Sequence, residues 1–94
     1  MRRRLDRAQE FALNLLRLRL ERGITQGDLA RHCRVTQSQI SRWERARSAP
    51  DAHELARLAA ILGVEVVRFY VPVTVEDGFS ILWRGFGGIE CQRQ

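Results

Sequence analysis

The sequence predicts a small, mainly α-helical domain that ends in a β-hairpin. Three tetrapeptides, TQGD, TQSQ and DAHE, each place a small oxygen-bearing residue three positions before a second polar residue, which is the pattern of a helix N-cap. Apolar residues at helical spacing follow each of them. After Val71 the period changes, and β-branched and aromatic residues flank Asp77-Gly78, a dipeptide favoured in two-residue hairpin turns. The length of 94 residues suits one hydrophobic core.

The first predicted helix spans Leu5 to Arg22 and ends before Gly23, a residue type that commonly follows a helix C-terminus. At about 100° per residue, its apolar side chains project onto one broad face. That face contains Ala8, Phe11, Ala12, Leu15, Leu16 and Leu18, and the opposite face contains Asp6, Glu10, Arg17 and Glu21. Arg19 falls within the apolar face, so its guanidinium needs a carboxylate partner.

The other helices are bounded by their N-caps Thr25, Thr36 and Asp51, with Pro50 before the last of these and Gly63 as a C-terminal stop. Their expected ranges are Gln26 to Cys33, Gln37 to Arg45, Ala52 to Leu62, and a short turn from Val66 to Tyr70. The inward side of the third helix contains Ile40, Trp43 and Glu44. We predict that Glu44 forms an ion pair with Arg19; in the alternative, Arg19 extends to solvent along its alkyl chain.

The positive charge of the chain is concentrated in its N-terminal half. All sixteen basic residues are Arg. Residues 1–47 contain twelve Arg and five acids, a net charge of +7, whereas residues 48–94 contain four Arg and six acids, a net charge of −2. This asymmetry points to nucleic acid or another anionic surface, and the planar guanidinium suits phosphates and guanine edges. The apolar runs are too short to span a bilayer and the N-terminus lacks the pattern of a signal peptide, so we expect a cytoplasmic protein without membrane contact.

Neither a metal site nor a catalytic constellation is predicted. Cys33, Cys91 and the two His residues show no metal-ligand spacing, and we interpret Cys33 as a packing residue and Cys91 as a free thiol in the tail. The sequence has no acidic cluster for a metal ion and no His paired with a nucleophile. We therefore expect no cofactor, no metal and no enzymatic activity.

The outward side of the third helix differs from an ordinary solvated surface. It contains Gln37, Ser38, Ser41, Arg42 and Arg45, which are short or planar hydrogen-bonding groups. Gln can bond an adenine edge and Arg a guanine edge, while Ser permits close approach. A solvated helix more often contains Lys and Glu in i,i+4 pairs. The pattern favours contacts to DNA bases, with a plain surface helix as the alternative.

The segment LRLRLERGITQGDLARHCRVTQSQISRWERARSAPDAHELARLAAILGVEVVRF resembles the lambda repressor and Cro type of helix-turn-helix domain, the XRE-like family, over about 55 residues. Its recurring elements include Gly23-Ile24-Thr25-Gln26, Val35-Thr36-Gln37, Trp43-Glu44 and Leu62-Gly63-Val64. The resemblance implies a DNA-binding domain of five helices over residues 1–70. The second helix would lie across the DNA groove, and Gln37 to Arg45 would be the recognition helix in the major groove. Such domains commonly bury a pair like Arg19 and Glu44.

The resemblance also assigns roles to individual residues. Gln26 would bond phosphate and brace Gln37, while Gln37, Ser38 and Arg42 would contact bases. Arg45 and Arg47 would contact phosphate, and Arg34 is placed to add another phosphate contact. The full expected DNA-binding set is Gln26, Arg34, Thr36, Gln37, Ser38, Ser41, Arg42, Arg45 and Arg47.

Two residues depart from the pattern of the family. Arg34 and Ala46 stand where the family favours Gly, and a positive φ at either would cost roughly 1 kcal/mol. The alternative is that the turn between helices two and three has a different shape.

The predicted function is that of a bacterial or phage transcriptional regulator, a repressor, that binds an inverted-repeat operator in double-stranded DNA as a homodimer. Residues 71–94 are predicted to form the dimerisation element, because several apolar residues exceed what a five-helix core needs; in the alternative, the hairpin only covers its own core. The predicted interface consists of Val71, Val73, Phe79, Ile81 and Trp83, with Leu13 and Leu20 at the edge of the first helix.

The initial Arg run is predicted to be a disordered arm, with DNA contact as the alternative. The alternative function is that of an antitoxin whose C-terminal segment binds a toxin as protein partner while its helices repress their own operon.

Overall fold

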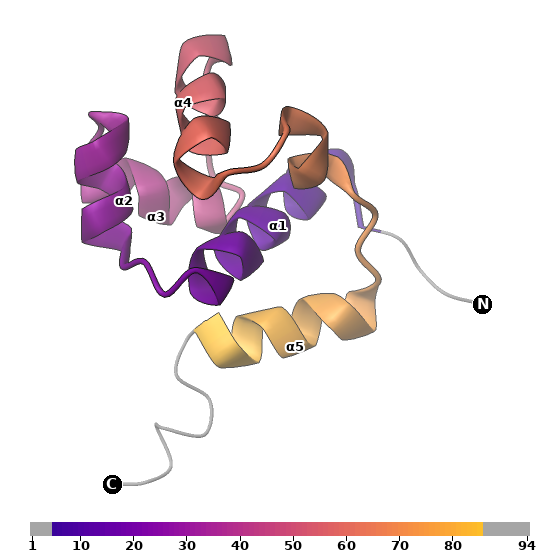
Figure 1. The fold of residues 1–94 in the computed structure, drawn as a ribbon. Coiled ribbons are helices and arrows are strands. Elements are labelled where there is room, and N and C mark those ends of the chain that lie inside the picture. The colour runs from indigo at the N-terminus through magenta and orange to yellow at the C-terminus, as the bar shows by residue number, and fades with distance from the viewer. Residues whose placement is uncertain (1–4, 86–94) are drawn as a thin grey trace, which may run out of the picture.

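The computed structural model describes residues 5–85, which form a bundle of helices without a β-strand in that range. The elements are α1 (Arg7–Glu21), α2 (Gln26–Cys33), α3 (Gln37–Glu44), α4 (Ala52–Leu62), the 3-10 helix η1 (Val66–Tyr70) and α5 (Val75–Gly85). Helix α1 runs through the middle, with α2, α3 and α4 on one side and α5 on the other (Figure 1). The ranges predicted for α2, α4 and η1 are confirmed. Helices α1 and α3 end one residue earlier than predicted, and α1 also begins two residues later.

N-caps begin the first four helices. Thr25 Oγ1 accepts a hydrogen bond from the Asp28 amide at 3.0 Å, without a reciprocal bond. Full capping boxes are present at Thr36 with Gln39 and at Asp51 with Glu54. A fourth cap, missed in the sequence, is formed by Asp6 and Gln9, and it explains why α1 begins at Arg7. Each cap satisfies amides that have no acceptor within the helix.

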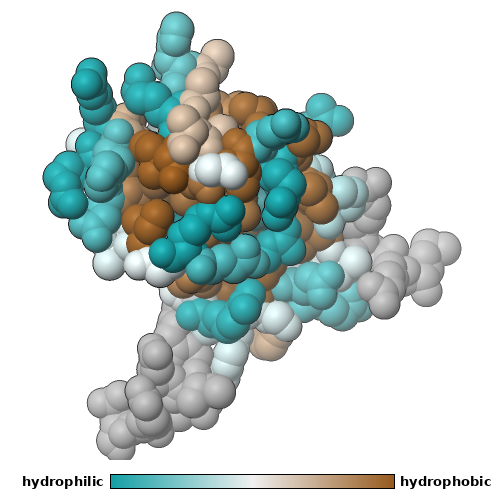
Figure 2. Space-filling model, in the orientation of Figure 1, coloured by the Kyte–Doolittle hydropathy of each residue, from teal (hydrophilic) through white to brown (hydrophobic). Residues whose placement is uncertain are grey.

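Two apolar clusters lie on either side of α1. The larger one joins α1 to α2, α3, α4 and η1, and its buried members are Phe11, Leu15, Leu18, Leu29, Ala30, Cys33, Ile40, Trp43, Leu58, Ala59, Leu62 and Phe69. The smaller one joins α1 to α5 through Leu13, Leu16, Val73 and Ile81. Cys33 is fully buried in the larger cluster and acts in packing, as predicted, and the same burial raises the pKa of its thiol. On the surface, hydrophobic residues gather in the upper half of Figure 2, where α4 and η1 lie.

The predicted hairpin around Asp77-Gly78 is wrong, because residues 75–85 form helix α5. Thr74 Oγ1 accepts from the Asp77 amide at 3.1 Å, which stabilises the first turn of a helix. A Cβ atom on Gly78 would lie 2.9 Å from Leu13 Cδ1, and one on Gly85 would lie 2.6 Å from Leu16 Cδ2. The two glycines therefore allow α5 to approach α1 closely; Gly78 serves packing here and not a turn.

The helical projection of α1 also needs correction on one side. Glu10, predicted to face solvent, is only 4% exposed, while Ala8 is exposed. One turn after Glu10, the fully buried Asn14 donates from Nδ2 to the carbonyl oxygens of Phe69 (3.0 Å) and Val71 (2.9 Å). Helix η1 and the segment after it pack on the side of α1 that contains Asn14. This second side of α1 is therefore also removed from solvent, whereas the projection predicted a single buried face.

Both predicted departures from the turn pattern have positive φ, 62° at Arg34 and 59° at Ala46. Glycine adopts this conformation without the steric cost paid by other residues, but it also loses more chain entropy on folding. We expect Ala46→Gly to raise the free energy of unfolding by about 0.5 to 1 kcal/mol in urea denaturation. The matched control is Ala56→Gly in the exposed middle of α4, which is expected to lower it by about 1 kcal/mol. A lower stability for Ala46→Gly would contradict the inferred strain.

The predicted Arg-rich arm and the tail with Cys91 lie outside the described residues 5–85. Within that range, every helix is too short or too polar to cross a membrane. The same residues contain no group of three His, Cys, Asp or Glu side chains arranged to hold a metal ion.

Candidate nucleic-acid interface

Helix α3 has one buried and one open side. Ile40 and Trp43 are 0% and 2% exposed and pack in the larger apolar cluster. Gln37, Ser38 and Arg42 on the other side are exposed, with Ser41 half-buried between them. Helix α3 therefore presents the polar residues expected for DNA contact to solvent.

A buried ion pair holds α3 to α1. Arg19 Nε donates to Glu44 Oε2 at 2.5 Å and Arg19 Nη2 donates to Oε1 at 3.2 Å, as the inward placement of both residues predicted. Arg19 Nη1 also donates to the carbonyl oxygen of Ile24 at 2.9 Å. Because Arg19 is 8% and Glu44 2% exposed, the pair is largely removed from water and fixes the end of α3.

A third hydrogen bond to Glu44, from a second donor residue, was not predicted from the sequence. Gln26, the first residue of α2, donates from Nε2 to Glu44 Oε1 at 2.9 Å. Gln37, the first residue of α3, places its Nε2 at 3.5 Å from Gln26 Oε1, the predicted bracing contact. A chain of polar contacts thus links the buried carboxylate to the exposed start of α3. The inward placement of Glu44 in the sequence predicts a partner for Arg19, but it does not indicate a further donor from α2.

The arginines divide into two groups, which the sequence alone did not separate. The side chains of the first group bond to other residues of the fold. Arg22 donates to the Leu62 carbonyl oxygen at 2.6 Å, and Arg57 donates to the Cys33 carbonyl oxygen at 2.8 Å. Arg17 donates to Asn14 Oδ1, and Arg31 forms an ion pair with Asp28 at 2.9 Å. The exposed side chains of Arg34, Arg42 and Arg47 form neither a hydrogen bond nor an ion pair with residues 5–85, and Arg45 is exposed at the C-cap of α3. Three guanidinium groups without an internal acid in residues 5–85, those of Arg34, Arg42 and Arg47, therefore lie on α3 or in the turns next to it.

The start of α2 adds a backbone site for an anion. Thr25 caps the helix, and the first amides of a helix have no intrahelical acceptor. These amides and the helix dipole favour a phosphate near Gln26 and Gly27. A substituent at Gly27 would meet Gln37 Oε1 at 3.6 Å, so the start of α2 lies close to the start of α3.

The predicted dimer residues fall into two classes. Val73 and Ile81 are 1% and 2% exposed in the smaller apolar cluster, so they are core residues of the protomer, because α5 is a helix packed on α1. Phe79 and Trp83 are 67% and 42% exposed, with ring centroids 6.4 Å apart, and Val71 is also exposed. This part of α5 is an open apolar face.

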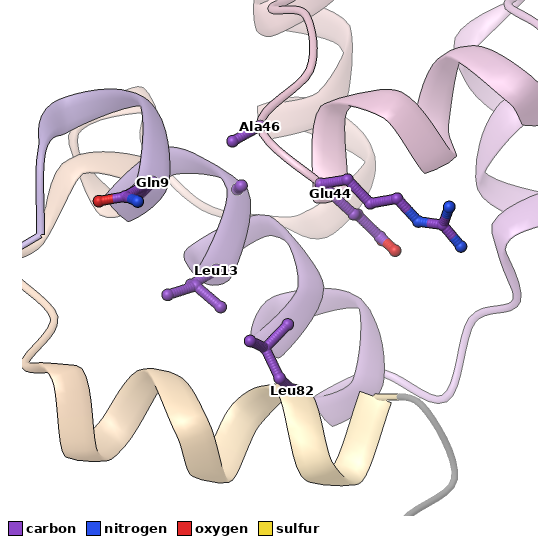
Figure 3. Close-up of a pocket in the computed structure, with 7 residues that line it drawn as sticks. Gln9, Leu13, Glu44, Ala46 and Leu82 are labelled. Atoms are coloured by element: carbon purple, nitrogen blue, oxygen red, sulfur yellow. The ribbon is translucent and has the colours of Figure 1, made fainter.

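A groove lies where α1, α5 and the end of α3 meet (Figure 3). Its volume is about 210 Å³, and it is lined by Gln9, Ala12, Leu13, Glu44, Arg45, Ala46 and Leu82. Leu82 comes from α5, and Glu44 and Ala46 come from the end of α3 and the residues after it. Helix α5 and the end of α3 therefore border the same groove, and both contact α1.

The family model HTH_3, helix-turn-helix, matches residues 15–69. Among solved structures, a hypothetical transcription factor, NHTF, from Neisseria is similar with a TM-score of 0.67 and 30% identity, over 71% of this chain and 77% of that chain. The clp gene regulator ClgR from Corynebacterium glutamicum is similar in fold, with a TM-score of 0.66 and 22% identity, over 94% of this chain and 89% of that one. No curated protein matches the sequence.

Proposed function

Because this chain belongs to the lambda repressor-like helix-turn-helix family of DNA-binding transcriptional regulators, we propose that it is a repressor that binds an inverted-repeat operator as a homodimer. The observation that carries the proposal is the open polar side of α3, on which Arg42 is exposed, with the exposed Arg34 and Arg47 in the turns before and after the helix. Helix α3 would enter the major groove and α2 would lie across it. Bound across a promoter, such a dimer represses by occupying the DNA.

Base contacts in this proposal come from α3. Gln37 stands at the first position of the helix, Ser38 follows, and Arg42 lies one turn beyond Ser38 on the same side. Gln suits adenine and Arg suits guanine, because each can form two hydrogen bonds to one base edge. Ser41 is half-buried and small, so it allows the helix to approach the groove closely.

Phosphate contacts would surround these base contacts. Arg34 lies in the turn before α3, and Arg45 and Arg47 lie at and after its end. Gln26, Thr36 and the amides at the start of α2 would bond a phosphate on the other side. These contacts set the position of the protein and contribute affinity for every sequence.

The dimer would form through residues 71–94, with residues 1–70 as the DNA-binding part. One recognition helix contacts few base pairs, and two half-sites one helical turn apart are the usual solution. The open side of α5 has the exposed aromatic residues Phe79 and Trp83, which are costly to leave in water and typical of interfaces. Because α5 lines the same groove as the end of α3, pairing α5 between protomers would fix the distance between the two recognition helices.

Selection of bound sequences from a random DNA pool tests operator and dimer together. We expect the wild-type protein to select an inverted repeat and to sediment as a dimer. Phe79→Ser/Trp83→Ser is expected to sediment as a monomer and to bind a single half-site weakly, because its apolar face is removed. The control is Val67→Ser, which alters an exposed apolar residue of η1 away from α5.

The outcomes separate the proposals. Failure of the wild-type protein to select any sequence would contradict the proposal that α3 contacts bases. If the wild-type protein is a monomer that selects a single half-site, the open side of α5 does not form a homodimer. This outcome favours the antitoxin function, in which that side binds a protein partner. A dimer that persists in the double variant would move the interface to other helices.

A further inference from the structure

We propose that Glu44, besides neutralising Arg19, is a positioning residue that sets the orientation of the Gln37 amide through Gln26. The proposal rests on the proposed DNA-binding function, in which Gln37 contacts a base. Its basis is the chain of contacts from Arg19 through Glu44 and Gln26 to Gln37. A carboxylate 2% exposed in the core would then influence which base is preferred at the surface.

The first step is the fixed carboxylate. Two Arg19 nitrogens donate to the two Glu44 oxygens at 2.5 and 3.2 Å, so the carboxylate cannot rotate without losing a charge-assisted hydrogen bond. Burial of both residues makes such a loss costly. Glu44 Oε1 is therefore an acceptor at a defined position beside the start of α2.

The second step is the orientation of Gln26. An ionised carboxylate only accepts hydrogen bonds, so the side of the Gln26 amide that faces Glu44 must be its NH2 group. Nε2 donates to Glu44 Oε1 at 2.9 Å. The opposite side of the amide, Oε1, then faces Gln37. A reversed Gln26 amide would place its oxygen against the Glu44 oxygen, with two acceptors and no proton between them.

The third step carries the constraint to Gln37. Because Gln26 presents an oxygen, Gln37 must turn its NH2 group toward it, and the two atoms lie 3.5 Å apart. This is a long hydrogen bond, and we expect it to shorten when DNA fixes Gln37. The second N–H and the oxygen of Gln37 then remain for a base. An N–H beside an oxygen matches N7 and the N6 amino group of adenine.

The test measures base preference on four duplexes that differ at one base pair, the one at which Gln37→Ala abolishes discrimination. We expect the wild-type protein to discriminate by about 5- to 150-fold. Arg19→Met/Glu44→Leu replaces the buried pair with apolar side chains of similar size, a change that commonly preserves folding. We expect this variant to remain folded and its discrimination at that base pair to fall below about threefold.

The matched control is Arg42→Ala, which is expected to keep the preference at the Gln37 base pair and to lose it at another. Gln26→Leu leaves the ion pair intact and breaks the same chain of contacts, so it is expected to lose the preference too. This variant decides the question if the double variant does not fold. Retention of wild-type discrimination by either folded variant would overturn the proposal.

A measurement without DNA keeps the inference separate from the proposed function. In NMR spectra of the free protein, the side-chain NH2 protons of Gln26 are expected to exchange slowly with water, and to exchange faster in the double variant. Fast exchange in the wild-type protein would overturn the orientation of Gln26. If the wild-type protein shows slow exchange but prefers no base at any position, base contact by Gln37 fails while the orientation of Gln26 stands.

Discussion

Replacing Glu44 by Ala is expected to lower the free energy of unfolding by about 3 kcal/mol, because it leaves the Arg19 guanidinium buried without a counter-charge. Arg19 is 8% exposed, so its head group cannot regain full hydration in the folded state. The Gln26 amide loses its acceptor as well. Urea denaturation followed by circular dichroism measures the change in the midpoint at constant slope.

Two controls show whether the cost comes from burying an unpaired charge or only from losing an ion pair. Asp28→Ala removes one partner of the exposed ion pair with Arg31 and is expected to cost no more than about 1 kcal/mol. Arg19→Met/Glu44→Leu removes both buried charges and is expected to cost much less than Glu44→Ala alone. A denaturation midpoint unchanged by Glu44→Ala would mean that the pair contributes nothing to stability.

The helices from α1 to α4 could be predicted because their signals are local. Each N-cap joins a side-chain oxygen to the backbone amide three residues later, and each apolar side follows the period of the same helix. The missed cap at Asp6 uses the same signal, in the tetrapeptide DRAQ. Local rules are sufficient where an element and its boundaries depend on neighbouring residues.

Helix α5 has one of these local signals, because Thr74 and Asp77 repeat the three-residue spacing of the other N-caps, but a second local signal beside it favours a turn. Asp77-Gly78 is locally compatible with a hairpin turn. What favours a helix is that Gly78 fits against Leu13 and Gly85 against Leu16, with Ile81 buried between them. The same contact explains why Ile81, expected at a dimer interface, lies inside the protomer.

The candidate site shows the same division between local and distant information. The exposed side of α3 follows from its period, which also placed Glu44 inward. Arg22 and Arg57 donate hydrogen bonds to the last carbonyl groups of α4 and α2. These contacts depend on which helix ends lie nearby in the fold, so they could not be predicted from the sequence. Total charge therefore predicted an anionic partner, while only the three-dimensional arrangement separates the arginines that stabilise the fold from those facing solvent.

The prediction that separates base contact from general attraction concerns Arg42 and Arg47. Arg42 lies on the open side of α3, one turn beyond Ser38, whereas Arg47 follows the end of the helix. Arg42→Ala is expected to cost about 1 to 3 kcal/mol on the preferred operator and to relax the choice at one base pair per half-site. Binding to a scrambled duplex is expected to change little.

Arg47→Ala is the matched variant, since it removes the same side chain from a position suited to phosphate. It is expected to weaken binding to both duplexes alike. The slope of log K against log salt should fall by about one unit for each phosphate that the variant no longer neutralises, because each neutralised phosphate releases roughly one condensed counterion. Salt titrations of the wild type and both variants on the two duplexes make the comparison. If Arg42→Ala weakens both duplexes equally, Arg42 contacts phosphate, and the exposed side of α3 does not select bases through it.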